Sequence, residues 1–158
     1  MNSFAKDYMP IFQAVQSLRG QLMDCLTDED LRYELPGNNP TLGVLCKEIG
    51  DIQSSYIQSL KTHTQNFTVH NETAGLAEGV TQLKTWFNEL DNELHTLVTG
   101  FSEEDLGQMI DRGHAFVLPV VAQLHVYKEA LLLFYGRASV YLKAIGKSPS
   151  QQWELWVG

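Results

Sequence analysis

Residues 76–97, LAEGVTQLKTWFNELDNELHTL, contain the most regular apolar pattern in the chain. Apolar side chains return after alternating steps of four and three residues, at Leu76, Val80, Leu83, Phe87, Leu90, Leu94 and Leu97. This spacing places one narrow apolar seam along a helix, as in helices that pack at small crossing angles in a bundle. We therefore predict a helix here that ends at Gly100, within an all-α fold.

Three further segments have a helical period. The second helix should begin at Thr41, an N-cap directly after Pro40, and the last should enter at Pro119 and stop at Gly146. The first helix has its stripe at Phe4, Tyr8, Ile11, Val15, Leu18, Leu22 and Cys25, with Pro10 marking its start or a bend.

The connections complete the predicted architecture. Residues 27–40 form a long first connection rich in turn residues, and residues 102–109 read as a short extra helix that opens at Ser102. No alternating pattern of useful length predicts a strand. The sequence thus predicts a four-helix bundle with a long first connection, formed as a single domain by residues 1–158.

Length and charge bound the function. The chain has 158 residues, enough for a substantial core, and a formal net charge of −8 with a pI near 5.0. A protein that binds a negatively charged partner needs clustered Lys and Arg on its surface, so we expect neither nucleic acid nor an anionic membrane as a partner. The N-terminus lacks the pattern of a signal peptide, and no segment approaches 18 consecutive apolar residues, which predicts a cytoplasmic protein.

Three motifs resemble one known family. The runs TLGVLCKEIGDIQ (residues 41–53), FSEEDL (101–106) and YGRASVYLKAIGKSP (135–149) are similar to the DinB/YfiT-like superfamily, over about residues 8–150. The resemblance implies a four-helix bundle that holds one divalent metal through three histidines. With Gly136 as the anchor, two of those histidines fall on Ala130 and Phe134, and the remaining one falls on Glu48.

This substitution predicts that the metal site is lost. A transition-metal site of this kind needs about three imidazole or carboxylate ligands, and neither Ala130 nor Phe134 supplies a donor. What the resemblance implies instead is a pocket at the metal position, formed by Glu48, Ala130, Phe134 and Tyr127. Two interpretations of Glu48 stay open: a carboxylate that faces this pocket and bonds to Tyr8 or Tyr127, or a half-exposed surface glutamate.

A rebuilt metal site has only weak candidates. His125 and Glu129 lie four residues apart on the last helix and could chelate zinc or nickel together with Glu48. On a helical wheel, however, they fall with Lys128 on a polar side, away from Phe134. We interpret them as part of a solvated face, and we expect no cofactor.

The last helix also suggests association. Residues 130–135, ALLLFY, are apolar on every side, so the bundle interior can cover only part of them. Leu132 and Tyr135 are left for the C-terminal tail or for a second subunit, which makes a homodimer one expectation. The tail residues Trp153 and Trp156 are interpreted as folding back on the bundle.

Two functional hypotheses follow. The first is a non-catalytic protein that binds a small apolar molecule or a protein partner. The alternative, taken from the resemblance, is a divalent-metal-dependent transferase or hydrolase acting on thiol conjugates, with a substituted ligand set that includes Glu48. The absence of both imidazoles favours the first.

Overall fold

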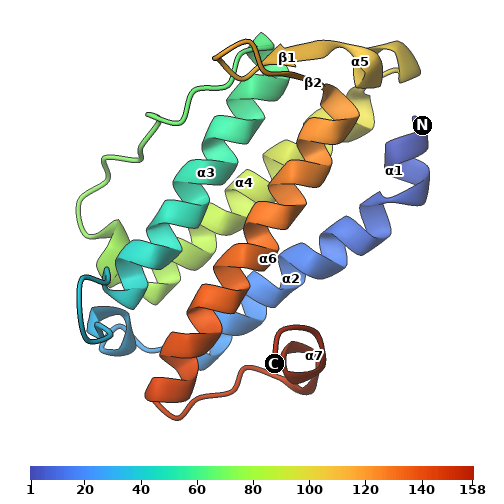
Figure 1. Cartoon of the computed structure of the whole chain (residues 1–158). Helices are drawn as coiled ribbons and strands as arrows, with labels where there is room; N and C mark the ends of the chain where they lie inside the picture. Colours follow the sequence, from blue (N-terminus) through green and yellow to red (C-terminus); the bar gives the residue numbers. More distant parts are fainter.

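The computed structural model describes all 158 residues, and four long helices dominate it. These are α2 (Met9–Cys25), α3 (Leu42–Thr62), α4 (Val80–Gly100) and α6 (Val120–Ala144). Both α2 and α3 pack against α4 and α6, so the four helices close into a bundle (Figure 1). The predicted all-α four-helix bundle is confirmed.

Shorter elements connect and cover the bundle. They are α1 (Ser3–Asp7), the 3-10 helices η1 (Asp30–Arg32) and η2 (Leu76–Glu78), α5 (Glu103–Gly107), the strands β1 (Met109–Asp111) and β2 (Val117–Pro119), and α7 (Gln151–Trp156). As predicted, the connection from α2 to α3 is long and a short helix lies within residues 102–109. None of the helices combines the length and apolar composition needed to cross a membrane.

The heptad seam is buried, although its helix is shorter than predicted. Leu83, Phe87, Leu90 and Leu94 all lie in the hydrophobic core. Leu76 is also buried, but it belongs to η2, and α4 begins only at Val80. The reason is local, because Gly79 adopts an extended conformation that separates the two helices.

The first predicted helix is two helices, and its early stripe was assigned wrongly. The chain breaks at Tyr8, two residues before Pro10, and α2 starts at Met9. Met9 and Phe12 are buried after this break, whereas Tyr8 and Ile11 are exposed. A helical wheel assumes an unbroken helix, so it cannot predict that the break changes which residues face the core.

Helix ends follow the predicted capping chemistry. The Thr41 hydroxyl accepts a hydrogen bond from the backbone N–H of Val44, and Ser102 and Asp105 form a reciprocal capping box at α5. Gly146, just after α6, has a φ of 70°, in the left-handed region that glycine favours. The sequence did not predict the short antiparallel hairpin β1–β2, which includes Val117 and leads into α6 at Pro119.

The C-terminal helix covers part of the apolar surface of α6. Trp153 of α7 is buried against Tyr135, with ring centroids 5.3 Å apart, and the Tyr135 hydroxyl donates to the Val15 carbonyl. The tail therefore covers Tyr135, as one of the two predicted alternatives required. Trp156 and Leu132 stay largely exposed.

Candidate functional site

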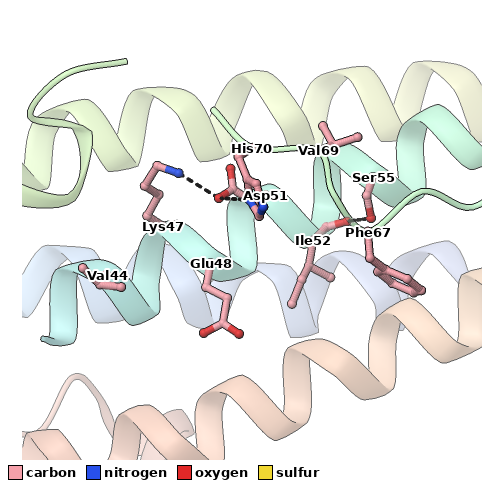
Figure 2. Close-up of a pocket in the computed structure, with 9 residues that line it drawn as sticks. All are labelled: Val44, Lys47, Glu48, Asp51, Ile52, Ser55, Phe67, Val69 and His70. Carbon is pink, nitrogen blue, oxygen red and sulfur yellow. Dashed lines mark hydrogen bonds and ion pairs between the residues drawn. The ribbon is translucent and has the colours of Figure 1, made fainter. Parts of the chain in front are cut away.

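A groove of about 430 Å³ lies between α3 and the connection that follows it. One wall is α3, and the other is the segment around residues 67–70, which runs beside the helix (Figure 2). Its apolar surface comes from Val44, Ile52, Phe67 and Val69, and its polar groups come from Lys47, Glu48, Asp51, Ser55 and His70. The groove is therefore amphipathic, and two of its apolar side chains, Val44 and Phe67, are about half exposed.

Asp51 holds the outer wall in place. Its carboxylate accepts hydrogen bonds from Lys47 Nζ at 2.8 Å and from the backbone N–H of Asn71 at 2.7 Å, and His70 Nδ1 lies 3.3 Å away. Figure 2 shows Lys47 and His70 converging on this carboxylate. With these partners, Asp51 has a structural task and little capacity left to bind a ligand.

A second hollow of about 170 Å³ adjoins the first along the α6 side of α3. Both hollows are lined by Glu48 and Ile52. The second one brings together Glu48, Ala130 and Phe134, three of the four residues predicted for the pocket. These residues come from two helices and are far apart in the sequence, so only the packing of α3 on α6 unites them.

Glu48 lies at the boundary between the two hollows. Its side chain is 49% exposed and its Oε2 atom is 3.5 Å from Arg137 Nη1, an ion pair across the helix interface. In Figure 2 the carboxylate points from α3 toward α6. No hydrogen bond joins Glu48 to Tyr8 or Tyr127, so that interpretation is wrong, and its exposure agrees with the alternative of a half-exposed surface glutamate.

Tyr127 does not line either hollow. It is fully buried, with its ring 5.7 Å from that of Phe12 and 5.3 Å from that of Tyr56, centroid to centroid. Burial raises the pKa of its hydroxyl, which has no hydrogen-bond partner. Its ring points into the bundle interior, in line with the apolar stripe of the last helix, and this separates it from Glu48.

The weaker metal candidates are also dispersed. His125 is not on a solvated face as interpreted, because its ring packs edge-on against Phe4 and Tyr8 of the N-terminal segment. Glu129 is exposed on the outer side of α6. No group of three or more His, Cys, Asp or Glu side chains gathers anywhere in the structure.

At the position where the resemblance would place a metal, the residues present do not fit one. Of Glu48, Ala130 and Phe134, only Glu48 offers an oxygen, and Arg137 is positioned to neutralise it. Ala130 and Phe134 contribute a methyl group and an apolar ring to the same hollow. One carboxylate beside a guanidinium is a poor substitute for three converging ligands.

Sequence reasoning missed a buried polar cluster in the bundle centre. Arg19 of α2 donates to Gln53 of α3 at 2.6 Å and to Asp91 of α4 at 2.7 Å, and Gln16 also donates to Asp91. The Arg19 guanidinium lies 4.1 Å from the centroid of the Phe87 ring. The sequence did contain a signal, because three polar residues of the cluster each lie four residues after one buried apolar residue and three before the next. They are Arg19 between Val15 and Leu22, Gln53 between Ile49 and Tyr56, and Asp91 between Phe87 and Leu94.

Solved structures of similar fold give the comparison with known proteins. A DinB-like protein, YjoA, from Bacillus subtilis superposes with a TM-score of 0.70 at 16% identity, covering 87% of this chain and 90% of that one. A DinB-like protein from Bacillus cereus superposes with a TM-score of 0.74 at 13% identity, covering 90% and 93%. No protein-family model and no curated protein matches the chain.

Proposed function

We propose that this chain, which has the DinB-like fold, binds a small, mainly apolar molecule in the groove along α3. The observation that carries the proposal is that two hollows adjoin along α3 and share two lining residues, Glu48 and Ile52. The second hollow lies where the resemblance to the DinB/YfiT-like superfamily would place a metal. We infer that the fold retains a recess there and uses it for binding without metal chemistry.

The lining indicates what such a molecule should look like. Apolar side chains from α3, α6 and the 67–69 segment contact its body, as is usual for small-molecule sites. Among the acidic groups, Asp51 is engaged by three neighbours, whereas Glu48 has a single partner at 3.5 Å. A ligand with a hydrogen-bond donor or an amine could therefore use the free acceptor capacity of Glu48.

The uncharged secondary amine N-phenyl-1-naphthylamine is a suitable probe, because its fluorescence increases in apolar surroundings. We expect saturable binding that the Phe67→Ser variant weakens at least about tenfold, through loss of apolar contact. Phe116→Ser is the matched control. Both phenylalanines are about half exposed and both face the Arg112 guanidinium, at 5.4 and 5.9 Å, but only Phe67 lines the groove.

Equal weakening in the two variants would assign the effect to the Arg112 contacts and would contradict binding in the groove. The affinity of the Glu48→Gln variant for the probe tests whether Glu48 takes part, because an amide oxygen is a poorer acceptor for an amine donor than a carboxylate. Unchanged affinity in Glu48→Gln together with tenfold loss in Phe67→Ser would support an apolar site in which Glu48 has no part.

The metal proposal can be tested separately. Protein without an affinity tag should contain far less than one equivalent of zinc or nickel, and added zinc should leave its Tm unchanged. The double variant Ala130→His and Phe134→His creates a His-His-carboxylate set with Glu48, so zinc should raise its Tm. The single variant Ala130→His should show a much smaller zinc effect. Loss of the buried Phe134 ring should itself cost about 3 kcal/mol of stability in the double variant.

Stoichiometric zinc in the unmodified protein, lost on Glu48→Gln, would reverse this conclusion. It would move the metal-dependent transferase or hydrolase to first place, with a substituted ligand set that includes Glu48.

A further inference from the structure

The outward face of α6 carries apolar side chains that no part of the chain covers. Leu133 is 73% exposed and Val140 is 54% exposed. In Figure 1, α6 lies in the foreground with no other element in front of its middle turns. This face borders the groove only through Leu133, so it is a separate surface.

Gly136 lies at the centre of this face. A Cβ atom placed on Gly136 would meet nothing within 4 Å, so the fold of one chain does not require glycine there. Glycine in the middle of a helix is destabilising relative to other residues, because it loses more backbone entropy on folding. A second helix that approaches closely would explain why the position has no side chain.

We propose that two copies of this chain associate through α6, antiparallel and related by a two-fold axis at Gly136. Residues at equal distances on either side of the axis then lie at the same level across the interface. Leu133 packs beside Val140 of the second copy, and the backbones approach at Gly136. Glu129 and Lys143 are each seven residues from Gly136, about 10 Å along the helix. Glu129 of one copy therefore lies beside Lys143 of the second copy.

Self-complementarity identifies a second copy as the occupant. All these side chains lie within about 60° of Gly136 around the helix, so they share one strip. The strip carries a negative group at one end and a positive group at the other, and both are exposed. An antiparallel copy pairs these charges twice, whereas a parallel copy would place like charges together in a chain of net charge −8.

Sedimentation velocity from about 1 to 200 µM tests the proposal. We expect a monomer–dimer equilibrium with a dissociation constant on the order of 10 µM, as suits a single helix pair. Gly136→Gln should weaken it at least about tenfold while the Tm of the monomer is maintained or increased, because glutamine forms helix well. Ile11→Gln, at an exposed apolar position on α2 that lines neither hollow, should leave the equilibrium unchanged and serves as the control.

Charge exchange tests the antiparallel register. Glu129→Lys and Lys143→Glu should each weaken the dimer, and the two together should restore it. A monomer at all concentrations would overturn the proposal. A dimer that is insensitive to Gly136→Gln would also overturn it, and so would a double charge exchange that fails to restore association.

Discussion

Replacing Asp91 with alanine should lower the free energy of unfolding by about 3–5 kcal/mol, the usual cost of removing one partner from a buried ion pair. The Arg19 side chain is only 1% exposed, while Asp91 is 28% exposed. Without Asp91, the guanidinium keeps the Gln53 amide oxygen and a 3.5 Å contact with the Phe87 carbonyl, but it has no counter-charge. A buried charge in this state is strongly destabilising.

Glu93→Ala is the matched control. Glu93 is also an acidic residue of α4 in an ion pair, but it and its partner Lys61 are 46% and 48% exposed. Removal of an exposed pair should cost at most about 1 kcal/mol. Chemical denaturation at neutral pH measures both losses. If Asp91→Ala cost no more than Glu93→Ala, the Arg19 cluster would contribute little to stability.

Gly43→Ala should also be strongly destabilising, by about 3 kcal/mol, which is the upper part of the range for overpacking. A Cβ atom at this position would lie 1.8 Å from the Ala77 carbonyl oxygen. The obstacle is the backbone of η2, which cannot rotate away as a flexible side chain can. We therefore expect η2 and the start of α3 to move apart, with loss of packing around Leu31 and Leu76.

Gly20→Ala should change the free energy of unfolding in the opposite direction. Gly20 is a helical residue of α2, and a Cβ atom there would meet nothing within 4 Å. Alanine should therefore stabilise the protein by about 0.5–1 kcal/mol through helix propensity. Denaturant midpoints of the two variants provide the comparison. Equal shifts in one direction would show that the close approach of Gly43 to η2 does not limit packing.

Several features followed from the sequence because they depend on near neighbours along the chain. The four-three spacing in residues 83–94 predicted a buried helical seam, and Thr41, Ser102 and Gly146 predicted where helices begin and end. Helical period and capping are set by residues three or four apart, so a linear pattern contains them. The absence of donor atoms at Ala130 and Phe134 is likewise a property of the residues themselves.

The break at Tyr8 and the late start of α4 are also local, but the periodicity concealed them. An apolar residue occurs in phase on both sides of Gly79, so the pattern continues where the helix does not. The apolar spacing shows which residues contact the core, but it does not show whether the helix between them is continuous. Different backbone conformations can place the same residues in the core.

Only the tertiary structure decided how the candidate site is assembled. Glu48 and Arg137 meet because α3 packs on α6. The outer wall of the groove depends on Asp51 binding the segment that follows α3. These contacts join residues 20 to 89 positions apart, and the relative rotation of packed helices is fixed by the whole core, which no local spacing rule encodes.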